Sequence, residues 1–224
     1  MTAGLRSHRR GAFITLEGVE GVGKSTNLAF VAERLRAAGK TVIMTREPGG
    51  VPVAERIREV LLADSPKAMP PLTELLLMFA ARAAHLRELV WPALDQGQWV
   101  VCDRFTDASY AYQGGGRGLD DAVIASIETA VQGTFRPDLT LLLDASWQGT
   151  RLRRDRRGAA DRFELEGREF FDRVRAAYLA RARAEPGRIR LIDAGGELPL
   201  VQQAIGRAVT SFLESLETDT PSDG

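Results

Sequence analysis

The stretch "GVEGVGKST", residues 18–26, decides the fold of this 224-residue chain. Its first eight residues fit the pattern G-x-x-x-x-G-K-[ST], in which glycines let successive backbone N–H groups turn toward phosphate oxygens. The stretch follows the apolar run "AFITLE" (12–17) and precedes a helical pattern, which is the context that such a loop needs. We therefore predict a phosphate-binding loop at the N-terminus of a helix, where the helix dipole favours anions.

The residue types of this loop predict its contacts with ATP and a metal ion. Lys24 can reach the β- and γ-phosphates, and the Ser25 hydroxyl suits Mg²⁺. The predicted ATP-binding residues are Gly18, Gly21, Val22, Gly23, Lys24, Ser25 and Thr26. The alternative is a glycine-rich turn with a chance lysine, and the flanking strand and helix patterns disfavour it.

Glu20 is unexpected inside such a loop. A carboxylate beside a nucleotide polyphosphate is electrostatically costly unless it meets a cation or a hydroxyl group. A hydroxyl on a second substrate would satisfy it. A solvated glutamate on the outer side of the loop is the alternative.

Length and composition bound the remaining possibilities. The chain is 44% hydrophobic and balances 30 basic against 30 acidic residues, so no global field favours nucleic acid or an anionic membrane. Lysine occurs only at 24, 40 and 67, so the basic residues are mostly arginine. No apolar run approaches the roughly 20 residues that span a bilayer. The single cysteine, Cys102, suits a reducing compartment, and we expect a cytoplasmic protein with no membrane or nucleic-acid partner.

Short apolar runs alternate with longer helical patterns along the chain. Five β-rich runs stand at 12–17, 41–47, 98–103, 139–145 and 188–194, and their near-continuous hydrophobicity is typical of parallel strands buried on both faces. Helical patterns occupy 25–40, 53–63, 73–94, 120–133, 169–185 and 200–216. This order predicts an α/β fold with a doubly wound parallel sheet in a single domain, 11–216, between mobile tails at 1–10 and 217–224.

Two segments after predicted strands supply candidates for a second substrate site. The carboxyl ends of parallel strands face the ligand crevice, so we expect Arg46 and Glu47 of "TREPGG" (45–50) to point toward the reacting centre. In "CDRF" (102–105), Asp103 is placed to face the metal and Arg104 to clamp an acceptor phosphate. A purely structural Asp103–Arg104 ion pair is the alternative.

Aromatic and apolar residues near these segments suggest a place for a planar base. "YAYQGGGRG" (110–118) adds aromatic rings, a glutamine and a predicted flexible turn. "MFAAR" (78–82) puts Met78 or Phe79 one helical turn from Arg82, so that a base can pack on the former and bond to the latter. Taken alone, Met78 and Phe79 are more typical of a core than of a ligand platform.

Missing motifs exclude a GTPase-type switch. The chain has no guanine-reading N-K-x-D, and the aspartates of "LLLDASW" (141–147) and "VVCDRFT" (100–106) lack the glycine of D-x-x-G. The same loop also serves motors and kinases, and these classes stay open at this point.

Taken together, these motifs resemble one family. "EGVEGVGKST", "TREPGG", "DRF…AYQGGGRG", "RPDLTLLLD" and "DRFE" occur in the order and at the separations found in bacterial thymidylate kinases. The resemblance covers roughly residues 12–213, and "REPGG" and "AYQGGGRG" are specific to that family among nucleotide kinases. It implies a P-loop nucleoside monophosphate kinase fold with a five-stranded parallel sheet flanked by helices, and a homodimer.

The resemblance implies roles for individual residues toward dTMP. Glu20 matches the carboxylate that holds the deoxyribose 3′-hydroxyl, Arg104 the arginine on the 5′-phosphate, and Arg82 the arginine at the thymine edge. Tyr112 matches the ring that disfavours a ribose 2′-hydroxyl, and Ser109 a polar position near the base. The family commonly has a stacking phenylalanine where this chain has Met78, so Met78 and Phe79 both stay candidates. The predicted dTMP-binding residues are Glu20, Pro48, Met78, Phe79, Arg82, Arg104, Ser109, Tyr112 and Gln113.

An arginine-rich run resembles the lid of these kinases, with bounds of about 148–165. "RLRRDRRGAADRFE" (151–164) contains six arginines, and a solvated helix face is the alternative for such a run. Residues 20–22 include no arginine, so the resemblance is to the branch whose lid supplies the catalytic arginine, for which we favour Arg153 and Arg157.

The expected reaction is phosphorylation of dTMP to dTDP by Mg-ATP. The candidate catalytic residues are Lys24, Asp103, Arg104, Arg153 and Arg157, with Ser25 and Asp103 as candidate Mg²⁺ ligands. A kinase for another nucleoside monophosphate is one alternative, and a non-catalytic nucleotide-binding module with the same fold is another.

Overall fold

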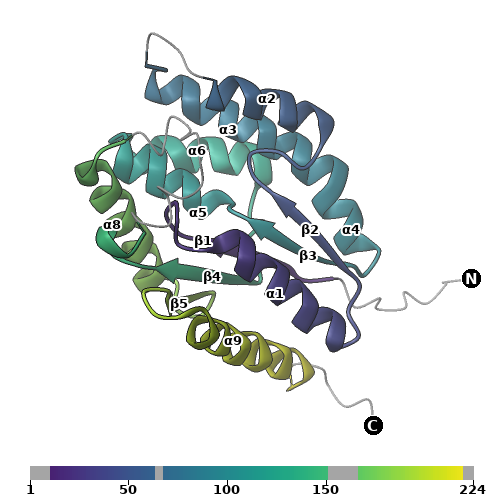
Figure 1. Ribbon diagram of the computed structural model, residues 1–224. Helices are drawn as coiled ribbons and strands as arrows, with labels where there is room; N and C mark the ends of the chain where they lie inside the picture. The colour runs from purple at the N-terminus through teal and green to yellow at the C-terminus, as the bar shows by residue number, and fades with distance from the viewer. Residues whose placement is uncertain (1–10, 64–67, 151–165, 219–224) are drawn as a thin grey trace, which may run out of the picture.

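The computed structural model describes residues 11–63, 68–150 and 166–218 (Figure 1). Five parallel strands form one sheet in the order β2-β3-β1-β4-β5, which confirms the predicted fold. The strands are β1 (Phe13–Glu17), β2 (Val42–Arg46), β3 (Trp99–Asp103), β4 (Leu139–Asp144) and β5 (Ile189–Asp193). β1 lies at the centre with later strands on both sides, so the loop after β1 lies at the point where the strand order reverses.

Helices cover both faces of this sheet, as Figure 1 shows. Helices α1 (Lys24–Ala37) and α9 (Leu198–Thr218) pack together, and α9 begins two residues before its predicted start and ends two residues beyond its predicted end. The remaining helical elements are α2 (Pro52–Leu62), α3 (Pro71–His85), η1 (Leu86–Val90), α4 (Trp91–Asp95), α5 (Thr106–Ser109), η2 (Tyr110–Gly116), α6 (Asp121–Gln132) and α8 (Arg168–Ala184). No helix in the described ranges is both long and apolar enough to cross a membrane.

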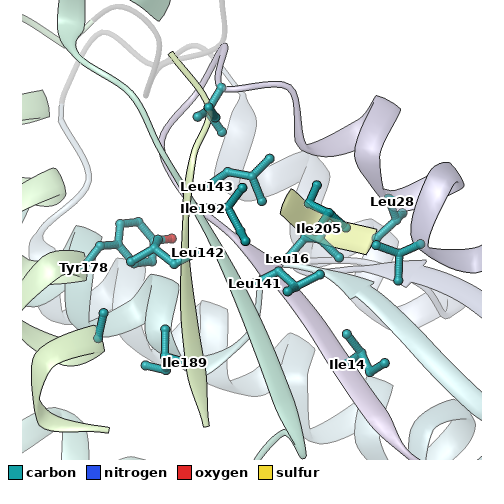
Figure 2. Close-up of a cluster of buried hydrophobic side chains, with 14 of the residues drawn as sticks. Ile14, Leu16, Leu28, Leu141, Leu142, Leu143, Tyr178, Ile189, Ile192 and Ile205 are labelled. Atoms are coloured by element: carbon teal, nitrogen blue, oxygen red, sulfur yellow. The ribbon is translucent and has the colours of Figure 1, made fainter. Parts of the chain in front are cut away.

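Alternation along β1 divides its side chains between the two faces. Ile14 and Leu16 belong to the core cluster that includes α1 and α9, whereas Phe13 packs with residues of η1, α4 and β3. Figure 2 shows Leu16 near Leu141 and Ile205, and Leu142 on the side of Tyr178. Glu17 shares the face of Phe13, which places a carboxylate toward α5 and α8.

The helical pattern at 73–94 forms a longer element with an irregular middle. α3, the π-helical segment η1 and α4 follow one another without a break in helical backbone geometry. Pro92 lies just after η1, and its ring has no N–H and crowds the carbonyl one turn earlier. Widening of the preceding turn into a π-helix accommodates that proline.

The segment 110–118 is not the flexible turn that its glycines suggested. Tyr110–Gly116 is π-helical, continues α5 and is mostly buried. A Cβ atom on Gly115 would lie 2.6 Å from the Ala177 side chain, and one on Gly116 would lie 2.6 Å from the Phe170 ring. The glycines are therefore needed because η2 packs very closely against α8.

Candidate active site

A cavity of about 230 Å³ opens at the carboxyl ends of β1, β2 and β3. It brings the glycine-rich loop together with the segments that follow the other two strands. Its lining residues are Glu20, Gly21, Gly23, Lys24, Ser25, Glu47, Pro48, Arg58, Leu62, Met78, Arg82, Asp103, Arg104, Phe105, Ala108, Ser109, Tyr112 and Gln113. Most of the predicted substrate residues in the described ranges thus share one cavity.

The glycine-rich loop has the backbone conformation that its sequence requires. Gly18, Gly21 and Gly23 all have positive φ, and Gly23 precedes the first residue of α1. A Cβ atom on Gly18 would lie 2.3 Å from the carbonyl oxygen of Leu143. Side chains at these positions would strain or displace the loop, so glycine is needed to bring it against β4 and to aim α1 at the cavity.

Lys24 is held inside the loop by backbone carbonyls. Its Nζ donates to the carbonyls of Gly18 at 3.0 Å and Val19 at 3.1 Å. Burial, with a further contribution from the charge on Arg104, lowers the pKa of Lys24 to about 8. A bound polyphosphate would stabilise the protonated form of this amine and draw it toward the anion.

Arg104 lies directly beneath the loop, in an unusual backbone conformation. Its φ of 69° is the only positive value at a non-glycine residue in the described ranges. Nη1 donates to the Gly18 carbonyl at 2.9 Å and to the Tyr178 hydroxyl at 3.2 Å, and Nη2 donates to Glu20 Oε1 at 2.8 Å. A strained backbone held by three side-chain contacts is typical of a functional residue.

Glu20 contacts both a cation and a hydroxyl group. These partners offset the electrostatic cost of placing a carboxylate in a phosphate-binding loop. Its Oε1 accepts from Arg104, and also from the Tyr112 hydroxyl at 2.6 Å. Burial favours the neutral acid, but the charges of Arg104 and Lys24 outweigh it and lower the pKa of Glu20. The side chain is only 16% exposed, so the solvated alternative was wrong.

Asp103 does not form an ion pair with its neighbour Arg104 in the described part of the chain, where Arg104 pairs with Glu20 instead. Its Oδ1 is buried at the cavity without a hydrogen-bond partner. Ser25, also on the cavity wall, is exposed in the first turn of α1. One carboxylate and one hydroxyl beside a polyphosphate site fit Mg²⁺, which takes few protein ligands and completes its shell with phosphate and water.

At the other end of the cavity Arg82 is fixed by a buried ion pair. Its Nε donates to Glu47 Oε2 at 2.7 Å, and His85 Nδ1 lies 2.9 Å from Glu47 Oε1. The guanidinium carbon lies 4.5 Å and 5.0 Å from the ring centroids of Phe79 and Phe105. Nη1 is buried without a hydrogen-bond partner, so it has a donor to offer a ligand.

The structure separates the two candidate stacking residues. Met78 lines the cavity, whereas Phe79 is 1% exposed and packs in a core cluster with Leu75, Tyr110 and Ile124. The Phe79 ring reaches the site only as a platform under Arg82. Gly18, Val22 and Thr26 also lie off the cavity wall, although the Gly18 carbonyl anchors both Lys24 and Arg104.

Three predicted polar residues line the wall between the two arginines. Ser109 Oγ accepts from Arg82 Nη2 at 3.1 Å, and the Gln113 amide donates to the buried Glu74 at 2.7 Å. The Tyr112 hydroxyl, which bonds Glu20, joins this wall to the glycine-rich loop. Pro48 lines the opposite side, where its carbonyl accepts from Arg58.

The expectation for Arg46 was wrong. Its guanidinium bonds Glu55 at the surface and is half exposed, whereas Glu47 points into the cavity. Successive side chains of an extended strand point to opposite sides, so Arg46 at the end of β2 and Glu47 directly after it face opposite ways.

Several wall residues had no clear sequence signal. Arg58 and Leu62 come from one face of α2, Phe105 directly precedes α5, and Ala108 lies within α5. The i, i+4 spacing of Arg58 and Leu62 was the one hint that α2 presents a face to the site.

The candidate lid arginines Arg153 and Arg157 lie outside the described residues, as does nearly all of the predicted lid, 148–165. Within the described ranges, Lys24, Arg58, Arg82 and Arg104 are the basic residues on the cavity wall.

Comparisons with known proteins agree on one family. The family model described as thymidylate kinase matches residues 16–205. A thymidylate kinase of Pseudomonas fluorescens (strain SBW25) is 60% identical over 204 residues, which are 91% of this chain and 97% of that protein. One from Alcanivorax borkumensis is 57% identical over 199 residues, 89% of this chain and 96% of that protein.

A solved structure supports the same assignment. The crystal structure of thymidylate kinase from Ehrlichia chaffeensis superposes with a TM-score of 0.72 at 30% identity, covering 89% of this chain and 99% of that one. The family match at 16–205 includes every residue of the cavity wall. The chain belongs to the thymidylate kinase family.

Proposed function

We propose that this kinase transfers the γ-phosphoryl group of Mg-ATP to the 5′-phosphate of dTMP, giving dTDP and ADP. Its family membership supports the activity. The observation that carries the mechanism is the cavity in which Lys24, Asp103 and Arg104 converge beside the glycine-rich loop. An acceptor phosphate on Arg104 would lie next to a donor phosphate held at the N-terminus of α1.

Catalysis in this site consists of positioning and charge neutralisation. The acceptor oxygen already bears negative charge, so the reaction needs no strong general base. Lys24 neutralises charge on the donor, and Arg104 orients the acceptor for in-line attack. Ser25 and Asp103 would hold Mg²⁺, and the bound ion would supply positive charge beside the phosphates.

The base and sugar would lie between Arg82 and Arg104. Arg82 offers Nη1, its donor without a partner, to the edge of thymine, beside Ser109. Met78, the candidate stacking residue on the wall, provides the apolar contact with the base. Tyr112 and Glu20, joined by their hydrogen bond, would bound the sugar and favour a 2′-deoxyribose that donates its 3′-hydroxyl to the carboxylate.

We also assign the catalytic arginine to the segment 151–164, by resemblance to the branch without an arginine at 20–22. Arg153 and Arg157 are the favoured residues, and each would neutralise the transferring phosphoryl group. Separate Arg153→Ala and Arg157→Ala variants are expected to keep ATP affinity and lose turnover. Unchanged turnover in both would refute this choice.

A coupled assay tests the proposed reaction. We expect ADP release from Mg-ATP to depend on dTMP and to be slower with dUMP, dCMP and dAMP. Faster turnover of dCMP than of dTMP would refute the choice of substrate. ATP binding without dTMP-dependent ADP release would instead identify a non-catalytic nucleotide-binding module.

A homodimer in the cytoplasm completes the proposal. Leu72 and Leu76 are about half exposed one turn apart on α3, and Val53 and Val60 are exposed on the adjoining α2. Such an apolar surface is suited to a second copy of the chain. Light scattering is expected to give twice the chain mass, and Leu76→Glu to give the monomer. The buried free thiol of Cys102 suits the reducing cytoplasm.

A further inference from the structure

A second carboxylate, Glu17, lies beneath Arg104 and has no role in the mechanism above. It is the last residue of β1, fully buried, on the face of the sheet opposite Leu16. Its Oε1 accepts from the backbone N–H of Phe105 at 2.7 Å, and its Oε2 from the Tyr178 hydroxyl at 2.7 Å. Both oxygens thus bond groups that border Arg104 in the chain or in space.

Tyr178 is the link between this carboxylate and the guanidinium. It projects from α8 and is 3% exposed, and its hydroxyl accepts from Arg104 Nη1 while donating to Glu17. A tyrosine hydroxyl has one proton and two lone pairs, so it can also accept from a protonated Glu17 and keep its bond from Arg104. The bond to Arg104 therefore persists in either protonation state of Glu17.

The attraction of Arg104 for an anionic ligand depends on how many ionised carboxylates lie near its guanidinium. Glu20 pairs with it directly, and Glu17 lies behind it through Tyr178. When Glu17 is neutral, fewer carboxylates offset the guanidinium, with Glu20 paired to it directly and Asp103 acting through its charge, and a phosphate dianion gains the most from binding. When Glu17 is ionised, a further negative charge offsets Arg104 and repels the phosphate.

We propose that Glu17 and Tyr178 form a positioning pair for Arg104, and that the proton on Glu17 sets how strongly the cavity holds the phosphate of dTMP. This inference rests on the proposed role of Arg104 as the dTMP clamp. Neither residue contacts the substrate in this account. Glu17 acts on the phosphate only through the charge and direction of Arg104.

The surroundings of Glu17 place its titration in a measurable range. Burial, and then the charge of Asp107 on α5, raise the pKa of Glu17 from 4.5 to about 8, against the lowering effects of Arg104 and of the bond from Tyr178. Lys24 on α1 and the Cys102 thiol on β3 also face it. The pKa of Lys24 is lowered to about 8 too, so a test must separate the two groups.

Because dTMP binding and protonation of Glu17 are linked, the protonation preference sets the direction in which dTMP affinity changes with pH. An anionic ligand favours neutral Glu17, so dTMP affinity is full below pH 8 and falls as pH rises through about 8. Because Glu17 releases a single proton, the affinity for dTMP can fall by at most roughly tenfold between pH 7 and pH 9. The second ionisation of a phosphate monoester, near pKa 6, is largely complete at pH 7 and raises the affinity with pH, opposite to the expected fall.

Equilibrium binding of dTMP to the full chain without ATP, from pH 6.5 to 9.5, tests the proposal. We expect the wild-type affinity to fall above pH 8 and the affinity of Glu17→Gln to be nearly independent of pH. Tyr178→Phe, which keeps the ring packing and removes a bond that lowers the pKa of Glu17, is expected to move the fall to higher pH. The matched control Tyr110→Phe removes another buried tyrosine–glutamate bond, to Glu128, and is expected to keep the wild-type profile.

Opposing outcomes are equally definite. A wild-type fall that persists in Glu17→Gln would assign the titration to Lys24 and overturn the proposal. If Glu17→Gln does not fold, an unshifted profile in Tyr178→Phe would overturn it. Failure of the proposed function is distinguishable, because the wild type would then not bind dTMP or would bind it equally well after Arg104→Ala.

Discussion

Arg82 and Arg104 lie in the same cavity, yet they are held in opposite ways. Arg82 stands on a regular helix, is 3% exposed, and is neutralised by the equally buried Glu47 between two phenylalanine rings. Arg104 stands in a loop with a positive φ, is 18% exposed, and shares its donors among a carbonyl, a hydroxyl and a carboxylate.

In the proposed function, this difference separates recognition of the base from recognition of the phosphate. A guanidinium whose charge is matched by an equally buried carboxylate has little net charge to offer, and its remaining N–H can bond a neutral acceptor that lies in the right direction. A guanidinium bonded largely to neutral groups keeps charge for an anion. Arg82 therefore suits the edge of thymine, and Arg104 suits the 5′-phosphate.

The largest expected effect is on the free energy of unfolding, and it follows from removing the carboxylate that pairs with Arg82. Glu47→Ala leaves Arg82 buried without its carboxylate, so we expect a loss of about 3–5 kcal/mol in the free energy of unfolding, measured in urea. Asp172→Ala is the matched control, because it breaks an exposed ion pair with Arg168. Its expected cost is below about 1 kcal/mol. Equal losses in the two variants would contradict the contrast.

At the phosphate end the principal loss is expected in binding. Arg104→Ala removes a charge-assisted contact and should weaken dTMP binding by at least about 2 kcal/mol, roughly thirtyfold. Titration calorimetry with dTMP and with thymidine separates the phosphate from the rest of the ligand. Thymidine affinity is expected to change little, and an equal loss for both ligands would refute the clamp role.

The stabilisation that Glu47 provides beside Arg82 is expected to depend on pH. Burial opposes ionisation of Glu47, but the charge of Arg82 and the bond from His85 outweigh it and lower the pKa below 4.5. The stabilisation from Glu47 is therefore full above pH 4.5 and is lost as pH falls through its lowered pKa. The difference in unfolding free energy between wild type and Glu47→Gln is expected to be constant from pH 7 to pH 4.5 and to shrink only as pH falls below 4.5. A difference that already shrinks between pH 7 and pH 4.5 would contradict the depressed pKa.

The smallest expected effect concerns the two neighbours at the base end. Met78→Ala removes an apolar contact from the cavity wall and should weaken dTMP binding by about 1 kcal/mol with little loss of stability. Phe79→Ala is expected to destabilise the fold by about 3 kcal/mol or more, because the ring is buried in the core. The reverse pattern would mean that the phenylalanine serves as the stacking ring.

The sequence was most informative where one local pattern determines the structure. Alternating strands and helices fixed the sheet, and the glycines of 18–23 fixed the loop. The sequence led to a wrong prediction for side-chain direction. Arg46 and Glu47 were both expected in the cavity, but these neighbours point in opposite directions. The sequence also hid contacts between distant segments, because nothing near Glu17 or Arg104 indicates that Tyr178 of α8 lies between them. The glycines of η2 suggested flexibility because the packing of α8 against them is not visible locally.

At position 104 the positive φ lowers the stability of the fold, while the arginine side chain serves the proposed activity. Glycine adopts that backbone conformation without penalty, whereas other residues pay about 1 kcal/mol or more. Drift toward a more stable chain would therefore favour a residue that cannot clamp a phosphate. On the proposed role of Arg104, selection for catalysis retains the arginine, so engineering for heat resistance should leave this position unchanged.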